Sequence, residues 1–109
     1  MRDFGYASLT PRELVEKLAG GEKPVLLDVR EPWEYERARI WGSRLVPLAE
    51  LQDRLHELDP GAETVVICHH GLRSAHATRF LDHSGFRNVY NLEGGLDAYS
   101  EVDGSVSRY

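Results

Sequence analysis

The sequence of 109 residues contains only one cysteine, Cys68. No disulfide can form within the chain, so a reducing, cytoplasmic compartment is expected rather than a secreted protein. Long apolar runs are also missing, because the longest spans residues 65–68, far short of a membrane span. Residues 1–6 lack the apolar stretch of a signal peptide, and we expect neither a targeting segment nor contact with a membrane.

An excess of positive charge is absent as well. The chain has 13 Lys and Arg against 18 Asp and Glu, which gives a formal net charge of −5. This balance argues against binding to nucleic acid or to anionic lipid. With 41% hydrophobic and 28% charged residues, the composition is that of a globular domain rather than a disordered chain. We expect one domain over residues 1–109, with its core at about 8–101 and a tail at 102–109.

Strand and helix patterns alternate along the chain. A capping box at Thr10, Pro11 and Glu13 predicts the start of the first helix, which Gly20 ends. Strand patterns lie at 24–29, 45–47, 64–68 and 88–92; helical patterns follow at 31–36, 48–58, 73–83 and 96–101. This order predicts an α/β fold with a mainly parallel sheet and helices on both faces. Ligands of such sheets bind just beyond the carboxyl ends of the strands, which directs attention to the loop after Cys68.

Several effects meet at the sulfur of Cys68. The four residues 69–72 form a loop, and Arg73 and Ser74 begin the next helix. The amino end of that helix, the charge of Arg73 and inward-facing loop amides would each favour thiolate over thiol. Because the thiolate is the nucleophile, this arrangement predicts a reactive cysteine, with Gly71 allowing the tight turn.

Arg73 breaks a local rule of helix stability. A cation in the first turn opposes the helix dipole, at a cost of about 0.3–1 kcal/mol. Such a violation beside a cysteine indicates a site that binds anions. The guanidinium fork suits an oxyanion better than an ammonium group would.

The segment 68–74, Cys-His-His-Gly-Leu-Arg-Ser, resembles the active-site loop of the rhodanese (sulfurtransferase) family. Three further segments match family motifs in the same order: Leu-Asp-Val-Arg-Glu-Pro at 27–32, Ile-Trp-Gly-Ser at 40–43, and a closing Gly-Gly motif within 92–99. The resemblance thus covers nearly the whole chain.

The resemblance implies a five-stranded, mainly parallel sheet and a catalytic Cys68. This residue would take sulfane sulfur from thiosulfate or a related donor, hold it as a persulfide and pass it to cyanide or a thiol. Arg73 would attract the anionic donor, and the donor-binding cradle would comprise His69, His70, Gly71, Leu72 and Ser74. Asp28 and Arg30 would support the site. No cofactor is implied, and we expect a monomer.

Some positions depart from the family pattern. Ala38-Arg39 stands where Gly-His often occurs, and Tyr99 where many members carry tryptophan, which bears on packing rather than on the chemistry. The mercaptopyruvate-using branch typically ends its loop in threonine, so Arg73 favours thiosulfate. Family phosphatases have one residue more between cysteine and arginine than the four found here, which argues against phosphate esters.

Other interpretations remain open beside small-molecule sulfur transfer. The same cysteine could serve a relay module that a desulfurase loads and that delivers sulfur to another protein; phosphatase or arsenate reductase chemistry on the same fold is a third possibility. Cys68 could also be buried filler, and Arg73 a solvated side chain. His69, His70, His76 and His83 lack the spacing of metal ligands, so no metal is expected. Trp33 and Trp41 are predicted to cover the sheet edge.

Overall fold

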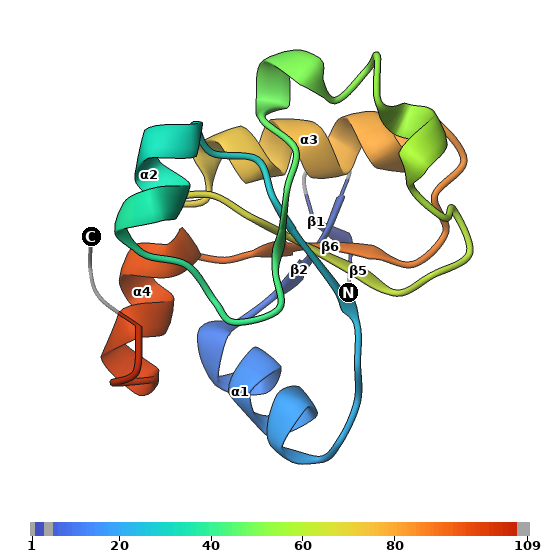
Figure 1. Ribbon diagram of the computed structural model, residues 1–109. Coiled ribbons are helices and arrows are strands. Elements are labelled where there is room, and N and C mark those ends of the chain that lie inside the picture. The colour runs from blue at the N-terminus through green and yellow to red at the C-terminus, as the bar shows by residue number, and fades with distance from the viewer. Residues whose placement is uncertain (1, 4–5, 107–109) are drawn as a thin grey trace.

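The computed structural model describes residues 2–3 and 6–106 (Figure 1). Six strands and four α-helices make up most of this part of the chain. The strands are β1 (Arg2–Asp3), β2 (Tyr6–Leu9), β3 (Val25–Asp28), β4 (Arg44–Leu45), β5 (Thr64–Ile67) and β6 (Val89–Leu92). The α-helices are α1 (Pro11–Ala19), α2 (Pro32–Arg37), α3 (Leu72–His83) and α4 (Gly95–Val102). Two 3-10 turns, η1 (Leu48–Glu50) and η2 (Leu55–Glu57), precede β5. None of the helices in the described part of the chain combines the length and the hydrophobicity that a membrane span requires.

The strands form one sheet in the order β1-β2-β6-β5-β3-β4. All neighbours from β2 to β4 run parallel, and the two-residue β1 pairs antiparallel with β2. The predicted mainly parallel sheet, with five parallel strands, is confirmed. The sequence patterns did not reveal β1 or β2. These two strands are only two and four residues long, which is too short for a clear pattern. Strand β2 is stabilised by its pairing with β6, which is distant in the sequence.

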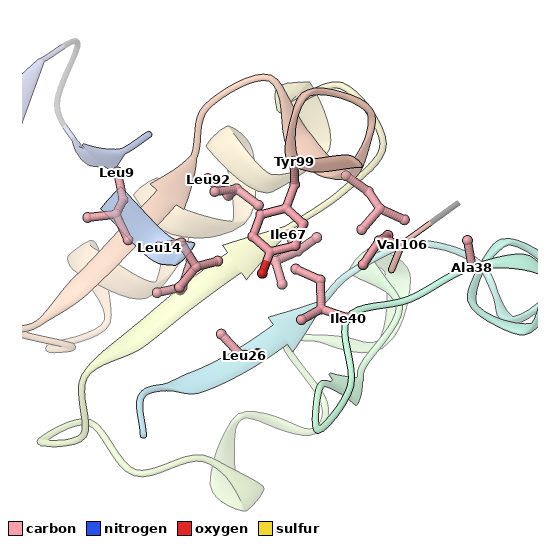
Figure 2. Close-up of a cluster of buried hydrophobic side chains, with 11 residues drawn as sticks. Leu9, Leu14, Leu26, Ala38, Ile40, Ile67, Leu92, Tyr99 and Val106 are labelled. Carbon is pink, nitrogen blue, oxygen red and sulfur yellow. The ribbon is translucent and has the colours of Figure 1, made fainter. Parts of the chain in front are cut away.

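A hydrophobic cluster fills each face of the sheet. Figure 2 shows the ring of Tyr99 from α4 over β5, close to Ile67 and Ile40, with Leu14 of α1 further along the same cluster. The second cluster lies under α3 and contains Leu81 and Cys68. Helices α1 and α4 lie on one side of the sheet and α3 on the other (Figure 1), as predicted. Both faces are therefore covered, and the ends of the strands remain as the place for a site.

The first helix begins as its sequence requires. The Thr10 hydroxyl accepts a hydrogen bond from the Glu13 amide at 3.1 Å, and the Glu13 carboxylate accepts one from the Thr10 amide at 2.8 Å. The predicted capping box is confirmed. This box fixes the turn by which the chain leaves β2 and enters α1.

The helix predicted over residues 48–58 is wrong. The segment forms two 3-10 turns with an irregular turn between them, and most of its backbone bonds span three residues. Its leucines nevertheless pack as expected, since Leu51 is buried and the others lie against the same cluster. Leucines spaced by three or four residues can line one face of either an α-helix or successive 3-10 turns. A short helix also gains little stability from helix propensity alone.

Two aromatic residues and the chain end differ from expectation. Trp33 is 54% and Trp41 94% exposed, so neither covers the sheet edge. Trp33 lies on α2, where the Arg37 guanidinium lies 5.8 Å from the centroid of its ring, and Trp41 lies on the exposed turn before β4. The expected tail, 102–109, begins inside α4, and Val106 is buried in the first cluster. Residues 107–109 lie outside the described part.

Candidate active site

Cys68 follows the last residue of the buried strand β5 and is 1% exposed. Three donors surround its sulfur. The amide of Gly71 lies 3.0 Å from Sγ, and the amide and hydroxyl of Ser74 each lie 3.3 Å from it. Two amides of the expected cradle thus point at the sulfur. The loop folds around the cysteine instead of opening to solvent, and this suits a sulfur that carries negative charge.

Gly71 lies where the loop turns into α3. Its φ of +96° lies in the left-handed region, and an added Cβ would come within 3.1 Å of the backbone nitrogen of Gly94. The left-handed conformation strongly favours glycine, and the close approach leaves little room for a side chain. The turn aims the Gly71 amide back at the sulfur of Cys68.

The Gly94-Gly95 turn holds the other side of the cysteine loop. The amide of Leu96 donates to the Cys68 carbonyl at 2.8 Å, and the amide of Asp97 donates to the His69 carbonyl at 3.1 Å. A Cβ on Gly95 would overlap both carbonyl oxygens. The start of α4 therefore clamps the backbone of the loop, which gives the family's closing motif a physical role.

Asn91, in β6, was not identified from the sequence as a site residue. Its amide group donates to the Gly71 carbonyl at 3.3 Å, and its Oδ1 accepts from the Ser74 hydroxyl at 2.5 Å. A hydroxyl has one proton, so the Ser74 hydroxyl donates either to Asn91 or to the sulfur of Cys68 at a given moment. A buried asparagine in an otherwise apolar strand was the signal that could have revealed it.

Glu34 is the second residue that the sequence did not reveal. Its two carboxylate oxygens accept from the Arg73 guanidinium at 2.6 and 2.8 Å. The Glu34 side chain is 3% exposed and that of Arg73 37%. Arg73 thus lies beside the loop as expected, with a carboxylate from α2 bound to it. In Figure 1, α2 lies on the same side of the molecule as the start of α3.

Asp28 and Arg30 form a buried ion pair at the end of β3. Neither residue is exposed, and three bonds of 2.8–3.1 Å join the guanidinium to the carboxylate. The Arg30 guanidinium also donates to the carbonyls of Glu34 and Ala38, at 3.3 and 2.5 Å. The pair thus joins α2 to the sheet and holds the backbone of Glu34 in place. It does not contact the sulfur.

The histidines lie at the rim of the loop. His70 is exposed, with Nδ1 3.8 Å from Oδ2 of Asp97, and its ring packs edge-on against His69 at 4.0 Å between centroids. Burial, with a smaller effect of His70, lowers the pKa of His69 from its ordinary value. Leu72 is 77% exposed. A depression of about 370 Å³ beside the loop is lined in part by His70, Leu72 and Asn91.

Within the described residues, no three His, Cys, Asp or Glu side chains come together in a way that could hold a metal ion. His76 and His83 lie on α3, away from the turn that binds the sulfur. The chemistry available here is therefore that of one cysteine sulfur, its hydrogen-bond donors and the charged groups at its rim.

Comparison with known proteins places this geometry in a family context. The rhodanese-like domain family matches residues 10–102. The chain is 41% identical over 81 residues to the putative sulfur carrier protein YrkF of Bacillus subtilis, covering 74% of this chain and 44% of that protein. It is 30% identical over 94 residues to the thiosulfate sulfurtransferase GlpE of Pseudomonas entomophila, covering 86% and 84% respectively.

A solved structure shares the whole architecture. The crystal structure of a rhodanese-related protein from Thermoplasma volcanium superposes with a TM-score of 0.84 at 34% identity, covering 95% of this chain and 100% of that one. The chain spans between 30% and 62% of the length of three curated relatives that are 39–41% identical to it. In such relatives a domain of this kind is one part of a longer protein.

Proposed function

The chain belongs to the rhodanese-like domain family of sulfurtransferases and sulfur carriers, and we propose that it moves sulfane sulfur through a persulfide on Cys68. The sulfur would come from thiosulfate or a related donor and pass to a thiophilic acceptor, cyanide or a thiol. In this proposal Cys68 is the catalytic residue. Gly71 and Ser74 stabilise charge on its sulfur, and His69, His70, Leu72 and Arg73 surround the path of the donor.

The observation that carries the proposal is the set of three donors aimed at one sulfur atom. A buried cysteine that only fills space needs no hydrogen-bond donors, since it behaves as a small apolar side chain. Here two backbone amides and a hydroxyl converge on Sγ within 3.3 Å. Donors fixed in a site shielded from water stabilise a developing negative charge at little reorganisation cost.

The reaction needs no oxidant and no cofactor. The Cys68 thiolate attacks the outer sulfur of thiosulfate, the S–S bond of the donor breaks, and sulfite leaves with the bonding electron pair. Cys68 then carries a persulfide, and the loop holds its negative charge. In the second step the acceptor, cyanide for example, attacks the outer sulfur and leaves as thiocyanate, which restores the thiolate.

The decisive experiment measures the mass of the intact protein after incubation with thiosulfate. We expect a gain of one sulfur atom, its loss on addition of cyanide, and no gain in Cys68→Ser. Turnover should vanish in the same variant. A protein that takes up no sulfur from any sulfane donor, yet hydrolyses a generic aryl phosphate, would overturn the proposal and favour phosphatase chemistry.

Sulfur relay between proteins is the second candidate. It is favoured by the similarity to a protein named as a putative sulfur carrier, and by relatives in which the matching region is only part of a longer chain. In this case a cysteine desulfurase would load Cys68. Loading from such a protein persulfide that is much faster than loading from thiosulfate would support the relay, and the reverse order would favour small-molecule turnover.

A further inference from the structure

The guanidinium expected to bind the anionic donor already has a carboxylate bound to it. Arg73 donates from both terminal nitrogens to the two oxygens of Glu34, in the fork-to-fork geometry of the strongest ion pairs. The Glu34 side chain is almost fully buried, so water screens this interaction little. An incoming anion would therefore meet a neutral pair rather than a free cation.

Glu34 is held in place from two further directions. The amide of Glu31 donates to Glu34 Oε1 at 2.9 Å, and the guanidinium of Arg30 holds the backbone carbonyl of Glu34. A flexible surface carboxylate could swing away when a substrate arrives. This one is tied to the first turn of α2, and α2 is tied to the sheet.

Two further carboxylates at the rim of the cysteine loop make the local charge more negative. Asp97 faces His70, and Glu93 lines the same depression as His70. Arg79 lies further along α3, over the ring of Tyr6. Asp28 and Arg30 cancel each other in the core. With Glu34 bound to Arg73, the carboxylates near the loop outnumber the cations. A donor with two negative charges would therefore bind weakly.

We infer that Glu34 is a specificity-determining residue that directs the site toward sulfane donors with one negative charge or none, namely thiosulfonates and persulfides, and away from the thiosulfate dianion. The inference rests on the proposed function, since it concerns the donor of the same Cys68 reaction. Glu34 acts through Arg73 and does not touch the sulfur. Arg73 then serves mainly to hold the loop against α2.

The chemistry balances for both donor classes. With a thiosulfonate, the Cys68 thiolate attacks the outer sulfur, the S–S bond breaks and a sulfinate leaves with the electron pair. With a protonated persulfide, the leaving thiolate takes the proton of the transferred sulfur and departs as a thiol. In each case Cys68 gains one sulfur atom and keeps one negative charge.

Methanethiosulfonate and thiosulfate make a matched pair of probes. They present the same outer sulfur on a tetrahedral sulfonyl group, and they differ in a methyl group against a charged oxygen. The measured quantity is the ratio of kcat/KM for the two donors, with cyanide as acceptor. In Glu34→Gln, whose amide oxygen can still accept from Arg73, the ratio should shift toward thiosulfate by about fivefold or more relative to wild type. Glu36→Gln, an exposed neighbour on α2, should leave the ratio unchanged.

The dependence of kcat/KM on salt is a second measurement. It would not change if Glu34 had a purely structural role. Attraction between opposite charges weakens as salt rises, so kcat/KM for thiosulfate in Glu34→Gln should fall with ionic strength. The wild-type value should stay flat or rise. This wild-type slope is measurable even if the variant folds poorly, and a steep fall in the wild type would overturn the inference.

The two levels of the proposal fail in different ways. If neither these two donors nor a persulfide adds sulfur to Cys68, the proposed function is wrong. If both donors load Cys68 but the donor ratio and the salt dependence are the same in Glu34→Gln and wild type, the function stands and the role of Glu34 is refuted.

Discussion

The amide of Leu96 donates a hydrogen bond to the carbonyl of Cys68 at 2.8 Å, so helix α4 reaches back to the residue that we propose as the nucleophile. This contact is possible because Gly95 has no side chain where the loop backbone passes. The Gly-Gly turn therefore belongs to the site as a spacer, although it contributes no functional group.

Gly95→Ala should damage both the fold and the reaction. The residue has a φ of +64°, and the new methyl group would meet two carbonyl oxygens of the loop. We expect a loss of about 2 kcal/mol or more in the free energy of unfolding, measured with urea, and slower sulfur loading of Cys68. Gly21→Ala is the matched control, because its φ is +88° but nothing lies within 4 Å of the added Cβ. A loading rate equally reduced in both variants would contradict the spacer role.

Ser74→Ala tests the hydroxyl beside the sulfur. The substitution removes the Oγ donor 3.3 Å from Sγ and leaves the backbone amide in place. We expect the rate of persulfide formation to fall about tenfold or more, because no hydroxyl can then turn from Asn91 to donate to the charged sulfur. The measurement is single-turnover loading followed by mass spectrometry. Ser84→Ala, which removes an exposed hydroxyl at the far end of α3, should load at the wild-type rate.

His69 should make stability depend on pH. Burial lowers the pKa of His69 in the folded chain below its ordinary value of 6.5, so the unfolded chain binds a proton first as the pH falls. The associated stability is fully present above 6.5 and is lost as the pH drops below it. In His69→Gln, the free energy of unfolding should therefore decline less than in wild type between about pH 7.5 and about pH 5. A wild-type slope in His69→Gln would count against this assignment.

Arg30→Met should strongly destabilise the fold, because it leaves the Asp28 carboxylate buried without its partner. We expect a loss of about 3–5 kcal/mol in the free energy of unfolding, partly recovered in the double variant Asp28→Asn/Arg30→Met. Arg44→Met breaks the more exposed pair with Glu57 and should reduce the free energy of unfolding far less. Equal losses in the two single variants would show that burial of the pair is unimportant.

The sequence was sufficient for features encoded locally or by a family motif. The capping box at Thr10, the alternation of strands and helices from β3 onward apart from residues 48–58, and the inward turn of the loop after Cys68 were predicted and are seen. The turns at 48–58 were misassigned because leucine spacing does not distinguish a helix from successive 3-10 turns. The exposure of Trp41 could not be foreseen, since a large ring is normally expected to find cover.

The parts of the site that escaped prediction depend on contacts between distant segments. Arg73 was identified as a cation beside the cysteine, but its carboxylate partner lies 39 positions earlier on another helix. Asn91 reaches Ser74 only because β6 lies next to β5 in the sheet. Nothing in the local pattern around either residue indicates its partner, and only the folded sheet brings them together.

The buried link from Asp28 through Arg30 to the carbonyls of Glu34 and Ala38 joins the rim of the candidate active site to the centre of the molecule. If Glu34 selects among sulfur donors as we propose, that selection is preorganised when the chain folds and does not await an arriving ligand.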